Sequence, residues 1–354
     1  MSATPIALPA SRVPDSATAP PLRWGVLGTG WAASHFVDSL HGNSGQRVVA
    51  VGSRSGAKAV AFARPFGIHR AYGSYEAVVS DPHVDVVYIA TPHNHHVENG
   101  LLALEAGKHV LIEKPISLSS EGLEMLLAVA TTRGLLVQEA FWTFFLPKYD
   151  VIRQLVADGA LGEIRSVVAD HGEWFADDHR IQDPALAGGA LNDLGAYPIA
   201  LATWVLGRPT DVRASVTWSA RGVPADVALL MRHGAGGAST LTTTIRSTTP
   251  CRAAIVGTEA TVLVDGAFFM PGRFSVEDAA TTRRLRYDEP SLRHDALHFQ
   301  AAEVARRITA GELCSPSWSH DDSREFLAGL ESAVAALPEP DALSVESLVR
   351  TYGQ

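Results

Sequence analysis

Residues 23–36 read Arg-Trp-Gly-Val-Leu-Gly-Thr-Gly-Trp-Ala-Ala-Ser-His-Phe. The run up to Leu27 is apolar and predicts a buried strand, and a helical pattern begins after Gly30. Gly28, Gly30 and Ala33 fit a dinucleotide-binding turn, GxGxxA, and an ordinary glycine turn does not explain their spacing. Such a turn lets a pyrophosphate approach backbone N–H groups at a helix N-terminus. The stretch therefore predicts a nucleotide site at the start of a Rossmann domain.

The chain alternates strand and helix patterns from residue 22 to residue 141. Short apolar runs, which predict buried parallel strands, occur at 23–27, 48–52, 84–90, 109–112 and 135–138. Apolar residues at helical spacing occupy 57–66, 75–80, 97–106 and 118–132. This alternation is typical of the α/β class with a doubly wound parallel sheet. We predict a Rossmann domain over residues 22–141.

The pattern changes after Phe141. Helices are expected at 146–158, 193–206, 296–310 and 319–336, with one strand at 164–170. Further strand-like runs without helices between them lie at 211–219, 225–231, 238–245, 252–256, 260–264 and 283–287. Such a run predicts an α+β domain with a large, mostly antiparallel open sheet. We assign substrate binding and oligomerisation to residues 142–354.

The first 21 residues are rich in Pro, Ala and Ser and have neither a basic stretch nor an apolar core. They predict a flexible leader rather than a signal peptide. No run reaches the roughly 18 apolar residues of a membrane span. The net charge of -9 argues against nucleic acid as a partner, and two cysteines without a CxxC pair fit a reducing compartment. We therefore expect a cytoplasmic protein.

Cofactor preference is predicted from the end of the second strand. A dinucleotide site for NAD usually has an acidic residue there, whereas an arginine accommodates the 2′-phosphate of NADP. The chain reads Ser53-Arg54-Ser55 and has no Asp or Glu between Arg47 and Glu76. This favours NADP over NAD, with Arg54 as the main contact and Ser53 and Lys58 as helpers. The alternatives are a solvated arginine, or one that stacks on adenine.

Further motifs follow later strands. They are Thr91-Pro92-His93 with His95-His96, Glu113-Lys114-Pro115, Glu139-Ala140-Phe141-Trp142 and Gly188-Gly189-Ala190-Leu191-Asn192-Asp193-Leu194-Gly195-Ala196-Tyr197. Together with residues 28–33 and 53–55, they resemble the Gfo/Idh/MocA oxidoreductases. The similarity is greatest to the branch with dihydrodiol dehydrogenases, NADP-dependent xylose dehydrogenases and glucose-fructose oxidoreductase. It covers nearly everything after residue 22.

The resemblance implies site residues. Lys114 is expected to hydrogen-bond the reacting oxygen, Tyr197 to remove or return the hydroxyl proton, and Asp193 to assist as the third catalytic residue. The expected cofactor contacts are Gly28, Thr29, Gly30, Trp31, Ala32, Ser53, Arg54, Lys58, Thr91, Pro92, His93, His96, Glu113, Lys114, Glu139 and Trp142. Asp193 and Tyr197 would share one helix face, since they are four residues apart; the alternatives are an N-cap and a core aromatic residue.

Substrate contacts are expected before the glycine pair, at His171, Glu173, Trp174, His179 and Arg180. No metal is required, because the histidines after residue 92 match the cofactor-side loop of the family. One departure is Phe144, where relatives commonly have arginine after Trp-Thr or Trp-Ser, so a more apolar or differently shaped substrate is expected.

The resemblance implies an NADP-dependent dehydrogenase or reductase that acts on a hydroxyl of a sugar, polyol or cyclic diol. The alternatives are an NAD-dependent glycosidase of the same fold and a non-catalytic nucleotide- or sugar-binding regulator. A sheet face without helices predicts a homodimer or homotetramer through the C-terminal sheet.

Overall fold

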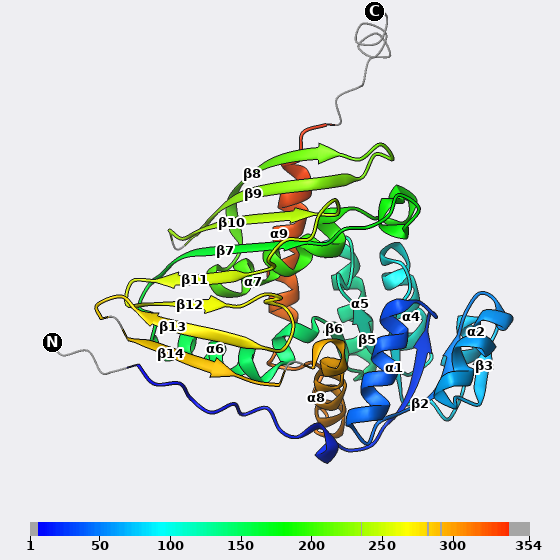
Figure 1. The fold of residues 1–354 in the computed structure, drawn as a ribbon. Helices are drawn as coiled ribbons and strands as arrows, with labels where there is room; N and C mark the ends of the chain where they lie inside the picture. Colours follow the sequence, from blue (N-terminus) through cyan, green and yellow to red (C-terminus); the bar gives the residue numbers. More distant parts are fainter. Residues whose placement is uncertain (1–5, 235, 282, 291, 340–354) are drawn as a thin grey trace, which may run out of the picture.

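The protein forms two sheets, each flanked by helices, as Figure 1 shows. The computed structural model describes residues 6–339 except 235, 282 and 291. The sheet with six strands is called sheet A, and the sheet with eight strands is called sheet B. The predicted combination of a parallel Rossmann sheet with a mostly antiparallel sheet is confirmed.

Sheet A is entirely parallel, with the strand order β3-β2-β1-β4-β5-β6. The strands are β1 (Arg23–Leu27), β2 (Arg47–Gly52), β3 (Arg70–Tyr72), β4 (Val86–Ile89), β5 (His109–Glu113) and β6 (Val137–Ala140). The order changes direction between β1 and β4, and ligands bind at the carboxyl ends of the strands beside such a switch point. The sequence did not predict β3, whose three residues are only half-buried.

Helices cover sheet A. They are α1 (Trp31–Asn43), α2 (Gly56–Ala63), α3 (Tyr75–Val79), α4 (His96–Glu105) and α5 (Ser120–Arg133). Phe36 of α1 stacks on Tyr88 of β4 with ring centroids 3.8 Å apart, and both side chains are buried. This contact fixes the first helix over the centre of the sheet.

Sheet B has the order β14-β13-β12-β11-β7-β10-β9-β8. Its strands are β7 (Ile164–Gly172), β8 (Pro209–Trp218), β9 (Pro224–His233), β10 (Ala238–Thr244), β11 (Ala253–Gly257), β12 (Ala260–Val264), β13 (Arg273–Asp278) and β14 (Arg284–Asp288). All neighbours are antiparallel except β7 and β10. The sequence did not predict β13, because Pro271 and Gly272 just before it are typical of a turn.

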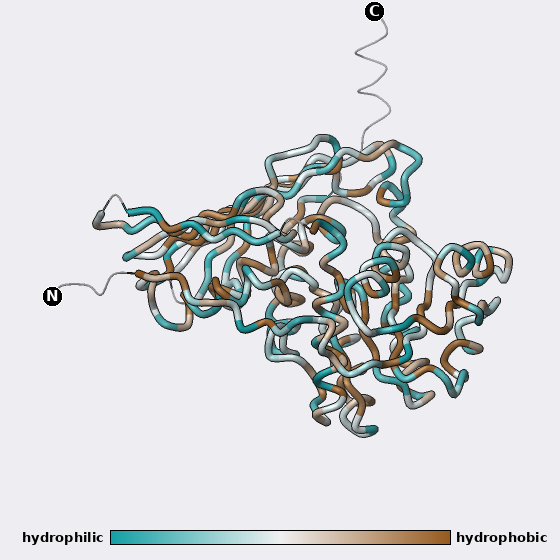
Figure 2. The backbone as a smooth tube through the Cα atoms, turned by 60° about the horizontal axis from the view of Figure 1, so that its bottom comes forward, coloured by the Kyte–Doolittle hydropathy of each residue, from teal (hydrophilic) through white to brown (hydrophobic). Residues whose placement is uncertain are grey.

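One face of sheet B is packed and the other is open. Helices α7 (Ala196–Leu206) and α9 (His320–Ala335) contact the packed face, and α6 (Pro147–Ala157) lies beside β13 and β14 of the same sheet, whereas α8 (His298–Thr309) lies against α1. Figure 2 shows hydrophobic and hydrophilic residues alternating along the strands of sheet B. Val168 and Leu230 flank Thr240 in register, so the three share a face, and both apolar side chains are about half exposed. This open face is the surface from which the sequence predicts oligomerisation.

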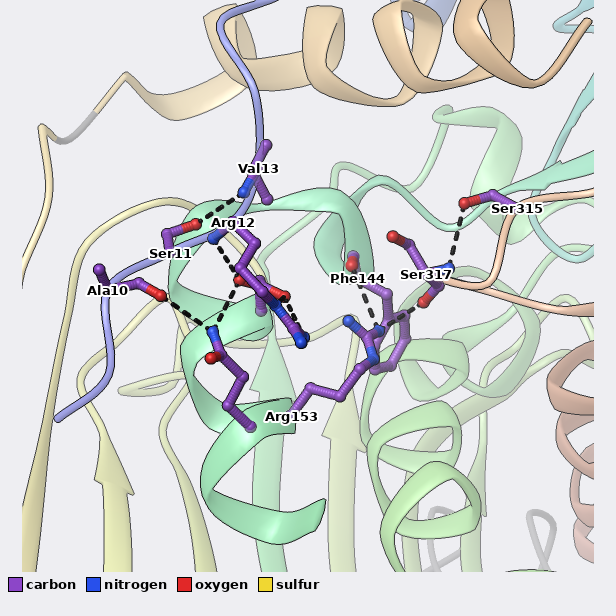
Figure 3. A network of polar contacts seen from close by, with 10 residues as sticks. Ala10, Ser11, Arg12, Val13, Phe144, Arg153, Ser315 and Ser317 are labelled. Atoms are coloured by element: carbon purple, nitrogen blue, oxygen red, sulfur yellow. Dashed lines mark hydrogen bonds and ion pairs between the residues drawn. The ribbon is translucent and has the colours of Figure 1, made fainter. Parts of the chain in front are cut away.

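The N-terminal segment is held against the rest of the chain, in contrast to the predicted flexible leader. The Arg12 guanidinium pairs with the Asp150 carboxylate at 2.9 Å, and the Ala10 carbonyl accepts a hydrogen bond from Gln154 (Figure 3). Arg306 of α8 donates to the Asp15 carbonyl. The prediction needs correction for residues 6–21, because polar contacts with α6 and α8 fix a segment whose composition suggested disorder. Residues 1–5 lie outside the described part. No helix among the described residues has the length and apolarity to cross a membrane.

Candidate functional site

The glycine-rich turn between β1 and α1 leaves a helix N-terminus open. Gly28 has φ +104°, and a Cβ there would lie 2.4 Å from the Ala90 carbonyl oxygen. Gly30 is the N-cap of α1, no side chain caps the helix, and a Cβ at this position would meet nothing within 4 Å. The first backbone N–H groups of α1 are therefore accessible to an anion. This fits a pyrophosphate held against Thr29, Gly30, Trp31 and Ala32.

A cavity of about 630 Å³ lies between the segments that follow β2, β3 and β4 of sheet A. Its lining includes Arg54, Tyr75, Thr91, Pro92 and Asn99. This volume lies within the usual range for ligand pockets of about 300–1,000 Å³. Ser53, by contrast, is buried and its hydroxyl accepts a local hydrogen bond from the Ser55 N–H. Lys58 is exposed in the first turn of α2.

The Glu113-Lys114-Pro115 motif lies at the carboxyl end of β5, as predicted. Tyr88 donates a short hydrogen bond to the Glu113 carboxylate, which also accepts the Lys114 N–H at 3.2 Å. Burial raises the pKa of Glu113, while the contacts with Tyr88 and Lys114 act in the opposite direction. Glu113 is therefore fixed from both sides where β5 ends.

The Lys114 ammonium is directed toward the second domain. Its Nζ donates to the backbone carbonyl of Asp193 and lies 4.8 Å from the centroid of the Tyr197 ring. Burial lowers the pKa of Lys114, although Asp193 and Glu113 oppose the shift. The structure thus brings Lys114 and Tyr197 together from positions far apart in the sequence.

Tyr197 lies in the first turn of α7 among aromatic residues. Its hydroxyl accepts a hydrogen bond from the Trp142 indole N–H at 3.0 Å, and its ring stacks on Phe269 at 4.7 Å. Burial, with the charge of Glu113, raises the pKa of Tyr197 far above its usual value. The phenol therefore retains its proton, which is the opposite of what the predicted base would need. Trp142, which is expected at the cofactor, contacts this hydroxyl.

Asp193 does not lie on an α-helical face with Tyr197. It belongs to a π-helical turn, Leu191–Gly195, and the N-cap of α7 is Gly195, so both the shared-face prediction and the N-cap alternative are wrong. The wider turn directs the Asp193 backbone carbonyl to Lys114. Its carboxylate pairs with Arg180 at 2.9 Å. Burial disfavours the charged form, but His93, Arg180 and Lys114 together lower the pKa of Asp193.

Two buried polar atoms, one of Asp193 and one of a neighbouring residue, have no hydrogen-bond partner within the described part of the chain. They are Asp193 Oδ2 and His93 Nδ1. His93 Nε2 lies 3.8 Å from Asp193 Oδ1, and burial lowers the pKa of His93 to about 3, so the imidazole is neutral at physiological pH. A polar ligand group between these residues and Lys114 would satisfy atoms that are otherwise costly to bury.

His96 and Glu139, both expected at the cofactor, are buried and hydrogen-bonded within the protein. His96 lies between the carbonyls of Thr91 and Pro115, at 2.9 and 2.7 Å, and ties the loops after β4 and β5 together. Glu139 accepts hydrogen bonds from the Ile116 N–H and from Trp318 and Ser323. Burial raises its pKa to about 7. The prediction placed Glu139 after a strand at 135–138, but β6 ends later and directs this side chain into the core.

The predicted substrate contacts divide into two groups. His171 lies 5.4 Å from Tyr197 between ring centroids and bonds Glu173 at 3.0 Å, while Arg180 reaches Asp193. The other two make different contacts: Trp174 is 66% exposed and lines a different cavity, and His179 accepts from the Ile181 N–H. Their loop leaves β7 and turns outward before Arg180, which sequence spacing does not reveal.

Two site residues were missed by sequence reasoning. Phe269 stacks on His171 at 4.2 Å and on Tyr197, and it follows β12 in a stretch typical of a loop. His294 lies 4.6 Å from the Trp31 ring and 5.8 Å from Trp142. It therefore lies between Trp31, at the glycine turn, and Trp142, which donates to the Tyr197 hydroxyl. Neither residue lies in a motif, so no sequence signal was present to find them.

Phe144, which stands where relatives commonly have arginine, lies among aromatic side chains. Its side chain is buried and stacks on Trp318 with centroids 4.3 Å apart, close to Tyr149 and Trp204. The side chain therefore packs into the core, and the expectation of a more apolar or differently shaped substrate stays a prediction. In the described residues no group of three His, Cys, Asp or Glu side chains could hold a metal ion.

Comparison with known proteins finds two family models in succession. Residues 22–141 match the oxidoreductase family with an NAD-binding Rossmann fold, and residues 149–263 match the GFO/IDH/MocA C-terminal domain. Trans-1,2-dihydrobenzene-1,2-diol dehydrogenase of Danio rerio is 33% identical over 311 residues, which cover 85% of this chain and 92% of the relative. D-xylose 1-dehydrogenase (NADP(+)) of Hypocrea jecorina is 41% identical over 206 residues, 52% of each chain.

A solved structure shows the same arrangement over almost the whole chain. It is KijD10, a 3-ketoreductase from Actinomadura kijaniata in complex with NADP and TDP-benzene. The TM-score is 0.79 at 26% identity, and the match covers 90% of this chain and 99% of that one.

Proposed function

Because the chain belongs to the Gfo/Idh/MocA oxidoreductase family, we propose that it transfers hydride between NADP and a secondary or anomeric hydroxyl of a sugar, polyol or cyclic diol. The observation that carries this proposal is the approach of Lys114 to Tyr197 beside unpartnered polar atoms of His93 and Asp193. The two named relatives act on a dihydrodiol and on xylose, which supports this substrate class. Residues 22–141 would hold the nucleotide and residues 142–354 the substrate.

The proposed chemistry divides the proton work between the two residues. NADP, when bound, supplies nicotinamide C4 as the hydride acceptor. Lys114, whose pKa is lowered by burial, is the better proton acceptor for the substrate hydroxyl. Tyr197 keeps its proton and donates a hydrogen bond to the same oxygen, while Trp142 occupies one lone pair of its hydroxyl. This assignment reverses the expected roles of Lys114 and Tyr197.

Asp193 would act as a positioning residue. Its backbone carbonyl holds the Lys114 ammonium and its carboxylate holds Arg180. His171, Glu173 and Arg180 are the proposed substrate contacts, because they line the same side of the Tyr197 ring or reach Asp193.

The NADP preference rests on Arg54. This side chain lines the cavity beyond the glycine turn, and no carboxylate follows β2 to bind a ribose 2′-hydroxyl. The name of the xylose dehydrogenase relative specifies NADP, which supports the same assignment. A homodimer or homotetramer through the open face of sheet B and a cytoplasmic location complete the proposal; Cys251 and Cys314, both free, fit a reducing compartment.

A screen of aldoses, polyols and diols, followed at 340 nm with NADP and NAD in parallel, tests the proposal. Net reduction of NADP by one of these classes is the expected result. An NAD-dependent glycosidase would release a sugar substituent without net reduction. A regulator would bind nucleotide and turn over none of the compounds.

A further inference from the structure

A second cavity, of about 420 Å³, lies at one end of sheet B. Its walls come from three segments: Trp174, Phe175 and Gln182 after β7, Trp218 and Arg221 at the turn between β8 and β9, and Arg246 after β10. The strand register explains their meeting, because Trp218 pairs with Pro224, and Thr244 pairs with both Asp226 and Gly172. None of these six residues belongs to the Lys114 and Tyr197 cluster.

One aromatic side chain of this cavity carries a buried hydrogen-bond donor. The Nε1 atom of Trp218 is buried and has no partner among the described residues. Trp174 is 66% exposed, although tryptophan usually buries most of its surface. Two indoles and one phenyl ring around a space of this size suit a flat or sugar ring that carries a hydrogen-bond acceptor.

The charged residues that line the cavity are Arg221, Arg246 and Asp177. Arg246 pairs with Asp226 outside the cavity. The Arg221 guanidinium donates to the Asp177 backbone carbonyl, and no ion pair to it occurs within the described chain. Arginine with free donors at a cavity wall suits a phosphate or carboxylate, which it binds with paired hydrogen bonds.

The cavity and the catalytic cluster share one loop. Phe175 lines the cavity and stacks on His179 at 4.7 Å between centroids, and the next residue, Arg180, pairs with Asp193. Gln182, further along, lines the cavity again. A ligand in this space would therefore contact the far side of the segment that carries Arg180.

We propose that this cavity is a second binding site, for a ligand that joins a flat or sugar ring to one anionic group. The ring packs against Trp174 and Phe175, and an acceptor atom on it takes a hydrogen bond from the Trp218 N–H. The anionic group pairs with the Arg221 guanidinium. This site does not depend on the proposed hydride transfer, since none of its residues touches Lys114 or Tyr197.

Calorimetric titration of the NADP-saturated protein tests the site. The probes are glucose 1-phosphate, thymidine 5′-monophosphate and benzoate, with glucose and benzyl alcohol as uncharged controls. Saturation with NADP keeps the nucleotide probe out of the Rossmann cavity. At least one anionic ring compound should bind at 1:1 stoichiometry, and its uncharged counterpart should bind at least tenfold more weakly. No binding of any anionic probe would overturn the proposal.

Variants locate the bound probe. Arg221→Met should weaken its binding at least tenfold and Trp218→Phe about threefold, whereas Arg213→Met on the exposed part of β8 and Lys114→Met should leave it unchanged. An equal melting temperature in all four variants, with an equal NADP affinity in the three that retain Lys114, shows that they are folded. Loss of binding in Lys114→Met would assign the probe to the catalytic centre, and unchanged binding in Arg221→Met would show that the cavity is not the site.

Discussion

At the scale of single residues, Arg54 is the simplest position to test. Replacement by alanine removes the only cation among the residues that line the nucleotide cavity beside Thr91 and Pro92. A charge-assisted hydrogen bond contributes about 1.5–3 kcal/mol, so Arg54→Ala should weaken the binding of NADP roughly tenfold to a hundredfold. The affinity for NAD, which lacks the 2′-phosphate, should change less than about threefold. Fluorescence titrations with both nucleotides make the comparison, and equal losses would show that Arg54 does not read the phosphate.

Trp142 gives a second test at this scale. Its indole N–H donates to the Tyr197 hydroxyl, so Trp142→Phe removes the donor and keeps an aromatic ring. A neutral hydrogen bond is worth about 0.5–1.5 kcal/mol, so kcat should fall roughly threefold to tenfold with little change in NADP affinity.

The control for Trp142 is the Tyr197→Phe background. Because Trp142 acts through the phenolic oxygen, the second substitution should cause no further loss of kcat there. Additive losses would mean that Trp142 acts elsewhere, for example by direct contact with the nicotinamide.

At the scale of elements, Glu139 joins the loop after β5 to α9 and to the segment before it. Its pKa of about 7 in the folded protein exceeds the ordinary value of 4.5. A raised carboxyl pKa means that its contribution to stability is complete below about pH 4.5 and is lost as pH rises to about 7. The loss amounts to about 3 kcal/mol of unfolding free energy.

Chemical denaturation of wild type and Glu139→Gln at several pH values isolates this effect. The wild type should lose stability relative to the variant between about pH 5 and pH 8, because glutamine does not titrate. A constant difference across this range would show that Glu139 is not protonated in the folded protein.

The elements also show what the sequence could predict. The glycine turn after β1 and the motif after β5 were placed correctly, since a buried parallel strand leaves a continuous apolar run next to its ligand residues. The turn before α7 was read as regular helix, because a π-helical turn contains the same residue types as an α-helix. Short or half-exposed strands such as β3 leave no such run.

At the scale of the whole molecule, the proposed catalytic pair comes together only because two domains meet. Lys114 follows β5 of sheet A and Tyr197 begins α7 below sheet B. Motifs predicted that both residues matter. The contacts of Tyr197 with Trp142 and Phe269 depend on how the sheets pack, and sequence patterns do not encode that packing.

The open face of sheet B predicts assembly. Val168 and Leu230 expose apolar area on the two strands that flank β10, and a second copy of this face would cover them. Light scattering at micromolar concentration should give at least twice the chain mass of 37.7 kDa. Val168→Lys with Leu230→Lys should shift the mass toward the monomer without unfolding the chain. A wild-type mass equal to one chain would refute the oligomer.

The pH dependence of oxidation follows from the assigned proton acceptor. Burial lowers the pKa of Lys114, and only its neutral amine accepts a proton. The oxidation rate should therefore rise with pH as Lys114 loses its proton, and reduction should show the opposite trend. A rate profile of Lys114→Met without this rise would agree with the assignment, whereas an unchanged profile would place the titrating group elsewhere.

The most direct test of the account is turnover of Lys114→Met, measured with NADP and a substrate found in the screen. Methionine keeps a stem of similar length and removes the ammonium that faces Asp193 and Tyr197. Loss of acid-base assistance should lower kcat by about two to four orders of magnitude, while NADP affinity stays within about twofold. Near-normal turnover, or a loss of NADP binding in proportion to activity, would contradict the catalytic role of Lys114.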